Sequence, residues 1–525
     1  MTGARSKMAY KNYCVVFILF ALAIVQAVGY DTELYDPPCD SNACFESLHG
    51  ALGDCSCNVD TIDYFNNVKI FPRIQSLVSK DYFRFYKVNL KKECPFWADD
   101  SRCAMKYCHI KTCSKESVPG YENGYNNDLD EETAAAKYSE EAQTTPCNSD
   151  SDHDPDLGYL NMTISAASQF EIAKWKAHDD SIDNFCDCDD RDVDAEYVDL
   201  SLNPERYTGY KGPSAHRIWR SIYQENCFRP KMNPYESFPY VLSSDFSNMC
   251  LEKRVFYRAV SGLHTSINIH LCSKYLLSEK GVGFAAPPEG EWGPNLEEFQ
   301  RRFDPSQTFG EGPAWLKNLY FVYLLEMRAL AKAGPYLENE DYFTGNPIED
   351  QETGDAIRNM LSVIYTFPDH FNESSMFTGG IQATKLKNEF REHFWNISRI
   401  MDCVGCDKCK LWGKLQTQGL GTALKILFSG RWDSPGDPEQ GNLPLRHKAN
   451  KRLQRTEIVA LFNAFARLSN SIRELENFRI MLSTQTESTK KKNVFCGVED
   501  PKIADTVDTK QEQCASGGAK PRIWS

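Results

Sequence analysis

Cysteine is the residue that most restricts how this chain can fold. The sequence contains 20 cysteines among 525 residues, and disulfides form and persist in oxidising compartments. A chain of this length buries an ample hydrophobic core, so its cysteines are not needed for stability as they are in small secreted domains. Their number and spacing therefore indicate either a disulfide framework or chemistry carried by sulfur.

Residues 1–29 are typical of a secretory signal peptide. Arg5, Lys7 and Lys11 precede an apolar run over 14–25, and small residues follow it. The run is shorter than the ~18 residues of a membrane-spanning helix, so we expect cleavage, with an uncleaved anchor as the alternative. Cleavage removes one of the 20 cysteines. The odd remainder implies a thiol that is free, intermolecular or exchanging.

Other features fit a lumenal or extracellular protein. We expect glycosylation at three Asn-x-Ser/Thr sites, Asn161, Asn372 and Asn396. The net charge of −14 favours solubility and argues against a nucleic-acid partner.

Helical periodicity dominates the chain, so we predict a mainly α fold. The expected helices cover 163–178, 248–277, 315–333, 383–400, 411–428 and 456–482. Gly334-Pro335 is expected to end the helix over 315–333, and residues 81–90 could form a short strand. We expect one catalytic domain over 30–486, a mobile acidic loop over 114–156 and a polar tail over 487–525. A disulfide-stapled N-terminal segment would contain Cys39, Cys44, Cys55 and Cys57.

Three cysteines are spaced for redox chemistry. Cys403, Cys406 and Cys409 follow one another at intervals of three, so on a helix they lie near one face. C-x-x-C at the start of a helix is a common dithiol device, because the helix N-terminus stabilises the attacking thiolate. The spacing therefore indicates a redox site.

Other chemistries for this cluster are less well supported. Zinc requires four ligands, and no Cys or His follows until His447. An iron–sulfur run would need a cysteine where Gly413 stands. Structural disulfides remain an alternative, although three cysteines cannot all pair among themselves. We expect no metal.

A second dithiol, Cys103 and Cys108, lies in a region with little helical periodicity. A mobile dithiol can take electrons from a protein substrate and pass them to a fixed one by thiol–disulfide exchange. Cysteine cannot deliver the electrons to oxygen at a useful rate, whereas a flavin can. No G-x-G-x-x-G follows a strand, so a flavin site would not be of the Rossmann kind.

These residues resemble the endoplasmic oxidoreductins, FAD-dependent oxidases that reoxidise protein disulfide isomerase. The likeness runs over about 44–482 and is most specific at 94–97, 203–213, 261–264 and 399–427. It implies a single α-helical domain with a helix-bundle core that encloses FAD.

The resemblance also implies roles for the cysteines. Cys406–Cys409 would be the inner disulfide, with Cys409 nearer the flavin, and Cys103–Cys108 the outer shuttle that accepts electrons from the isomerase. Structural bridges would be Cys94–Cys403 and Cys227–Cys250. Inhibitory pairings would be Cys103–Cys147 and Cys108–Cys113.

The family pattern for FAD falls on six residues of this chain. Their chemistry suits a dinucleotide, with two guanidinium groups for the pyrophosphate, one indole for stacking and three hydrogen-bonding side chains. The residues are Arg206, Thr208, Trp219, Ser261, His264 and Arg302.

The chain departs from the family pattern in several places. Where vertebrate relatives have a second arginine after the Arg302 region, this chain has Trp315, so that flavin contact is expected to be absent or replaced. The family has a cysteine at the position that corresponds to about residue 46 of this chain, and here Cys39 replaces it. The additional cysteines are Cys188, Cys272, Cys496 and Cys514, and we hypothesise a Cys188–Cys272 bridge.

The resemblance implies a thiol oxidase that makes disulfides in the lumen of the endoplasmic reticulum and supports oxidative protein folding. Protein disulfide isomerase would be its substrate, and oxygen its acceptor, leaving as hydrogen peroxide. No Lys-Asp-Glu-Leu ending is present, so retention would depend on partners, and peripheral contact with the lumenal membrane face is one option. The alternatives are a disulfide-rich binding glycoprotein and an isomerase-like exchanger without an oxygen acceptor.

Overall fold

A computed structural model of the chain describes residues 48–97, 109–120, 185–205, 213–228, 249–275, 294–367, 371–428 and 453–495. Several predictions lie outside these ranges: the signal peptide over 1–29, the helix over 163–178, and most of the loop over 114–156 and of the tail. Within the described ranges, no helix has both the length and the apolar composition to cross a membrane.

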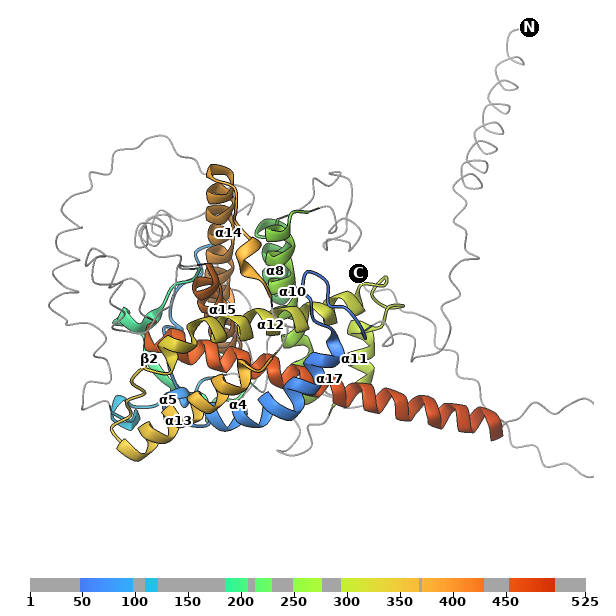
Figure 1. The fold of residues 1–525 in the computed structure, drawn as a ribbon, viewed down its shortest axis with the longest axis horizontal. Coiled ribbons are helices and arrows are strands. Elements are labelled where there is room, and N and C mark those ends of the chain that lie inside the picture. Colours follow the sequence, from blue (N-terminus) through green and yellow to red (C-terminus); the bar gives the residue numbers. More distant parts are fainter. Residues whose placement is uncertain are drawn as a thin grey trace, which may run out of the picture.

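The core is a bundle of long helices, which confirms the predicted mainly α class. In Figure 1 the two longest helices, α12 and α17, run side by side across the molecule, and α14 and α15 stand across them. The central members are α10 (Leu251–His270), α12 (Gly312–Leu337), α15 (Asp407–Phe428) and α17 (Arg455–Phe495).

Two glycines allow these helices to approach closely. A Cβ added at Gly262 of α10 would lie 2.3 Å from the backbone oxygen of Asn318 in α12. One added at Gly419 of α15 would lie 2.3 Å from Cβ of Ala464 in α17. Both distances are far below van der Waals contact, so any side chain here would force the helices apart.

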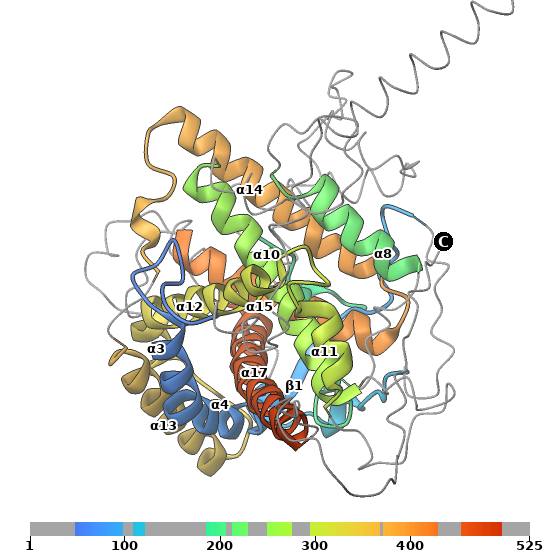
Figure 2. The same ribbon diagram turned by 90° about the vertical axis from the view of Figure 1, so that its right-hand side faces the viewer.

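Shorter helices surround this bundle. Figure 2 shows α3, α4 and α13 gathered on one side of α17, with α11 on the other. The α-helices of this layer are α3 (Val59–Tyr64), α4 (Phe71–Val78), α8 (Pro213–Arg220), α11 (Leu296–Phe303), α13 (Pro347–Ile364) and α14 (Ile381–Ile400). Single-turn π-helices extend α3, α8 and α10: η1 (Phe65–Ile70), η6 (Ser221–Glu225) and η7 (Leu271–Tyr275).

One small sheet lies at the edge of the bundle. Strands β1 (Phe85–Val88) and β2 (Glu196–Asp199) pair antiparallel, with Phe85 opposite Asp199. The strand expected within 81–90 is therefore confirmed in part. Its first residues instead form the single turn α5 (Asp81–Arg84).

The predicted stop at Gly334-Pro335 is wrong, because α12 continues to Leu337. A proline in the last turn of a helix loses only one backbone hydrogen bond, so the helix can run past it for a few residues. Gly334 has a packing role instead. A Cβ there would lie 1.8 Å from the hydroxyl oxygen of Tyr365, which follows α13.

Two other boundaries differ from the predictions. Helix α15 starts at Asp407 rather than 411, and α17 extends to Phe495, so the expected tail begins with helix. Helix α13 was not predicted, although the sequence carries its signals. Asn346 caps it through a bond from the Ile348 amide, Pro347 is its first residue, and acidic residues fill its first turn.

Candidate redox site

The three clustered cysteines lie at a break between two helices. Cys403 ends the short 3₁₀ turn η9 (Met401–Cys403), and Cys406 directly precedes α15. Cys409 lies in the first turn of α15, where the Lys410 amide donates to the Cys406 carbonyl over 2.8 Å. Cys406 and Cys409 thus occupy a helix N-terminus, as the spacing predicted, whereas Cys403 lies outside the helix. All three are buried.

Cys403 forms the predicted structural bridge with Cys94. Their sulfurs are bonded at 2.02 Å, and the bond joins positions 309 residues apart. Cys94 lies in the stretch that follows β1. The bridge therefore ties the edge of the sheet to the segment that presents Cys406 and Cys409.

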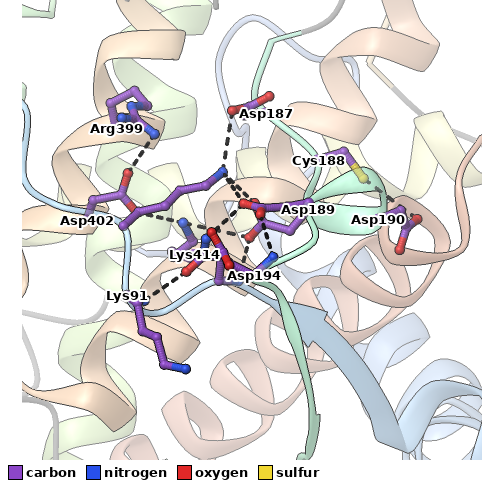
Figure 3. A network of polar contacts seen from close by, with 12 residues as sticks. Lys91, Asp187, Cys188, Asp189, Asp190, Asp194, Arg399, Asp402 and Lys414 are labelled. Carbon is purple, nitrogen blue, oxygen red and sulfur yellow. Dashed lines mark hydrogen bonds and ion pairs between the residues drawn. The ribbon is translucent and has the colours of Figure 1, made fainter. Parts of the chain in front are cut away.

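A buried ionic network surrounds this bridge (Figure 3). Asp402, next to Cys403, accepts from Lys414 of α15 over 2.6 Å and lies 3.1 Å from Arg399 of α14. Lys414 also lies 3.8 Å from Asp189, which begins the 3₁₀ turn η5 (Asp189–Arg191). Lys92, two residues before Cys94, pairs with Asp189 over 2.6 Å.

The charges of this network support one another. Burial alone would raise the pKa of Asp189, but Lys414 and Lys92 hold it below its ordinary value. The pKa of Lys92 is raised: burial opposes its charge, but Asp189 and Asp187 outweigh that effect. We infer that the ionic network and the disulfide together hold the stretch of Lys92 and Cys94 against the stretch of Asp402 and Cys403, which leads into the redox site.

Cys406 is disulfide-bonded in this structure. This disulfide is not the expected one, because Cys409 is not bonded to Cys406. Cys94–Cys403 is the one disulfide that joins two described cysteines. The geometry of Cys406 and Cys409 is consistent with exchange, since they share one helix end. Cys103, Cys108 and Cys147 lie outside the described residues.

Other expected bridges are not formed among the described cysteines. Cys227 is buried after η6, whereas Cys250 is exposed at the start of α10, and they are not joined. The hypothesised Cys188–Cys272 bridge is absent too: the Cys188 thiol donates to Asp190, and Cys272 is buried in η7.

Two further cysteines appear as thiols rather than in the predicted pairings. Cys113 donates its S–H to the Tyr197 carbonyl over 2.7 Å, so it is not bridged to Cys108 here. In the N-terminal segment, burial raises the pKa of the Cys55 thiol to about 12. Cys39, Cys44, Cys496 and Cys514 lie outside the described residues.

Residues predicted to contact FAD gather around α10. Trp219 of α8 stacks on His264 of α10, with ring centroids 3.6 Å apart and planes 17° apart. Asn268 donates to the His264 carbonyl over 3.0 Å and also bonds to Arg302 of α11. Ser261 lies one turn before His264. The structure therefore brings these four together, and Arg206 and Thr208 lie outside the described residues.

His264 is neutral at physiological pH. Burial, together with the nearby charge of Arg302, lowers its pKa to about 3. Its Nδ1 lies 3.0 Å from the Tyr223 hydroxyl, which restrains the ring. A neutral imidazole can accept or donate a hydrogen bond without adding charge to the site.

The Ser261 hydroxyl is held by a chain of buried groups. Asn318 of α12 donates to Ser261 over 3.0 Å and accepts from Arg258 over 3.1 Å. Arg258 in turn donates to the carbonyls of Leu52 and Gly53, next to Cys55. This chain, which the sequence did not reveal, joins the N-terminal cysteine segment to the predicted flavin residues.

Trp315 lies in the first turn of α12 near this group. It is half-buried, and its side chain hydrogen-bonds Tyr257, which also bonds Ser261. The position that departs from the family pattern is thus linked through Tyr257 to Ser261, one of the side chains predicted to face FAD. It supplies an aromatic ring there instead of a charge.

The donors present fit FAD. A guanidinium, a hydroxyl, a neutral imidazole and an indole match the phosphate, ribose and ring parts of such a molecule. At 3.6 Å the stacked rings of Trp219 and His264 leave no space for a third ring between them. Trp219 and His264 would together hold the ring part of the cofactor.

A second group of residues missed from the sequence anchors the stretch before Arg206. Glu205 pairs with Arg467 of α17 over 2.5 Å, and its carbonyl lies 3.0 Å from Nε2 of His270 in α10. Arg467 also lies over the ring of Trp412 in α15, at 5.2 Å. Trp412 is one turn after Cys409 on α15. The contacts from Trp412 to Arg467 and from Arg467 to Glu205 therefore connect the helix of the dithiol to the stretch before Arg206.

The chain is similar to one family of known proteins over most of its length. The family model for Endoplasmic Reticulum Oxidoreductin 1 matches residues 69–475. "Ero1-like protein" of Drosophila melanogaster is 54% identical over 496 residues, covering 92% of this chain and 99% of that protein. "ERO1-like protein alpha" of Homo sapiens is 50% identical over 486 residues, covering 90% and 99%.

Among solved structures, Ero1p, described as the source of disulfide bonds for oxidative protein folding in the cell, aligns with a TM-score of 0.49 at 27% identity. The alignment covers 82% of this chain and 99% of that one. The matched family is one of oxidoreductases that act on disulfides. By sequence, the chain belongs to the endoplasmic reticulum oxidoreductin family.

Proposed function

We propose that this protein is an FAD-dependent thiol oxidase of the endoplasmic reticulum lumen that oxidises a thioredoxin-like partner, protein disulfide isomerase. The observation that carries the proposal is the dithiol at the start of α15. Cys406 directly precedes this helix, and Cys409 lies one turn before Trp412, which contacts Arg467, the partner of Glu205 beside Arg206. Family membership supports the same reaction class.

The proposed relay begins at the outer pair. Two thiols of the partner reduce the Cys103–Cys108 disulfide by exchange, so the partner gains a disulfide and the shuttle becomes a dithiol. That dithiol then reduces Cys406–Cys409 in the same way. Overall, two thiols and one oxygen molecule give one disulfide and one hydrogen peroxide.

FAD, when bound, supplies the two-electron acceptor that cysteine lacks. Trp219, Ser261, His264 and Arg302 would hold it, together with Arg206 and Thr208. Neutral His264 and its partner Tyr223 would fix the ring stack. Trp219, Tyr223 and Ser261 are buried, which would keep water away from a ligand held there.

Oxygen consumption tests the proposal. Purified protein with a reduced thioredoxin-like protein should consume oxygen and release an equal amount of hydrogen peroxide. An isomerase-like exchanger would form disulfides only from an added oxidant, with no oxygen uptake, and that result would refute the oxidase.

The disulfide-rich binding protein is disfavoured by the state of the cysteines. Cys55, Cys113, Cys188 and Cys272 are thiols in the structure, whereas a purely structural framework would pair them. The absorbance spectrum of the purified protein separates the two hypotheses, because a binding protein of this kind would show no flavin absorbance.

A further inference from the structure

The segment 109–120, which directly follows Cys108, lies against the small sheet. Val118 packs with Phe85 and Tyr197 in a cluster separate from the main core. Cys113 donates to the Tyr197 carbonyl over 2.7 Å. The segment 109–120 is therefore attached to the small sheet, but only by these few contacts.

Asn203 clamps the backbone of this segment. Its Oδ1 accepts from the Lys111 amide over 2.7 Å, and its Nδ2 donates to the Lys111 carbonyl over 2.9 Å. A third bond, from Nδ2 to the Asp199 carbonyl over 3.0 Å, fixes the amide plane. Asn203 is fully buried, while Lys111 is exposed. Asn203 therefore binds the backbone of Lys111 and makes no use of its side chain.

The same asparagine is bonded to the helix that carries the inner dithiol. The indole Nε1 of Trp412 donates to the Asn203 carbonyl over 2.9 Å. Trp412 follows Cys409 by three residues on α15, so both lie near one face of that helix. Asn203 therefore bridges the segment after Cys108 and the helix of Cys409.

A second contact brings the two cysteine segments together directly. Nδ1 of His109 lies 3.5 Å from Oδ2 of Asp407, the first residue of α15. His109 follows Cys108, and Asp407 follows Cys406. The contact therefore joins the described segment that begins after Cys108 to the first residue of α15.

We propose that Asn203, with Trp412 and the His109–Asp407 contact, docks the outer dithiol segment onto the inner dithiol. Asn203 is then a positioning residue for the exchange between Cys103–Cys108 and Cys406–Cys409. This inference rests on the proposed oxidase function. It adds to that function the residues that hold the outer dithiol segment beside the inner dithiol.

Docking has a clear physical benefit. Exchange requires a thiolate to approach a disulfide sulfur closely, and a tethered group reaches it more often than a freely moving loop. The clamp acts only on the transfer between the two dithiols. It has no part in the later passage of electrons from Cys409.

The sharpest test removes the clamped amide without altering Asn203. Lys111→Pro deletes the N–H that bonds to Oδ1, on an exposed segment. Thr112→Pro is the matched control, because the Thr112 amide makes no hydrogen bond within the described residues. Both are compared with wild type for oxygen consumption with a reduced thioredoxin-like protein and with dithiothreitol, which can reduce the inner dithiol directly.

We expect Lys111→Pro to lower kcat for the protein substrate by about threefold to tenfold, the size of one lost hydrogen bond. KM for that substrate, turnover of dithiothreitol and the unfolding temperature should stay at wild-type values, and Thr112→Pro should match wild type throughout. Trp412→Phe, which removes the indole N–H that bonds to Asn203 and also makes the buried ring smaller, should lower kcat for the protein substrate at least as much.

Two results would overturn the docking role. One is unchanged kcat with the protein substrate in Lys111→Pro. The other is an equal loss with both substrates, which would indicate a general structural defect. Failure of the oxidase function itself would look different, since wild type would then consume no oxygen with either substrate, and the docking role would fall with it.

Discussion

The two dithiol regions are attached to the protein in opposite ways. The inner one lies at the start of the long helix α15, and the Cys94–Cys403 bridge holds the segment before it. A buried network of Lys92, Asp189, Asp402 and Lys414 adjoins both cysteines of the bridge in the sequence, and Figure 3 shows Asp189, Asp402 and Lys414 within it. The outer segment 109–120 is exposed along most of its length. It is held by the Asn203 clamp, one thiol hydrogen bond and a small apolar cluster.

This difference suits a relay. A dithiol that must deliver electrons to a fixed acceptor needs a defined position, because electron transfer depends on geometry. A dithiol that must meet a separate protein needs access, and a few directional contacts are enough to return it to the inner site. The following predictions are ordered from the largest expected effect to the smallest.

Cys409→Ala should abolish turnover of both protein and small dithiols while flavin remains bound. Cys409 is the inner thiol proposed to pass electrons onward, and among the described cysteines only Cys406 shares this helix start with it. Steady-state oxygen consumption and the flavin absorbance of the purified variant are the measurements. Cys188→Ala, which removes a half-buried thiol outside the relay, is the control. Wild-type turnover in Cys409→Ala would contradict the inner role.

Asp402→Asn should destabilise the inner region strongly. Both partners of Asp402, Arg399 and Lys414, are buried or nearly so, and removing one member of such a network costs about 3 kcal/mol. Denaturant unfolding measures this loss. Asp355→Asn, which breaks an exposed pair with Arg358, should change the free energy of unfolding by less than about 1 kcal/mol. Equal losses would mean that the inner network is not specially stabilising.

Acid should weaken the same network. The pKa of Asp189 is lowered in the folded protein, so its contribution is present above its unfolded value of about 4 and is lost as pH falls through the folded pKa. We therefore expect the free energy of unfolding to decline below about pH 4 and the decline to be shallower in Asp189→Asn. Parallel curves for the two proteins would rule out this source of pH dependence.

Asn318→Ala should weaken flavin binding by up to about thirtyfold, because it removes the bonds to Ser261 and Arg258, each worth about 1 kcal/mol. Equilibrium dialysis of flavin, or the flavin content of the purified protein, measures this. The neighbouring Lys317→Ala should bind flavin like wild type. If both variants bind equally well, the chain from Arg258 to Ser261 does not support the flavin site.

Cys113→Ala should have the smallest effect. The thiol makes one hydrogen bond, to the Tyr197 carbonyl, so its loss should cost less than about 1 kcal/mol of stability. Thermal unfolding is the measurement. A loss as large as that of Asp402→Asn would show that the outer segment is as firmly held as the inner region.

The sequence predicted those features that depend on local spacing. The helix start at Cys406–Cys409 followed from C-x-x-C, and the long helices followed from apolar periodicity. The Cys94–Cys403 bridge came only from family resemblance, because no local rule relates positions 309 residues apart.

The features that were missed depend on tertiary contact. Asn203, Trp412 and Arg467 act through partners on other helices, so neither periodicity nor spacing reveals them, although Asn203 lies in the stretch most typical of the family. Gly334 was taken as a terminator because its role, the approach of Tyr365, is visible only in three dimensions. The bridges Cys227–Cys250 and Cys108–Cys113 were expected from resemblance, and the structure does not form them.

The most direct test of the account is the visible absorbance of the purified protein before and after anaerobic addition of a dithiol, followed by admission of air. The account predicts a flavin spectrum that bleaches with dithiol and returns with oxygen in wild type, and that stays unbleached in Cys409→Ala. A colourless protein, or a flavin that bleaches equally in the variant, would contradict it.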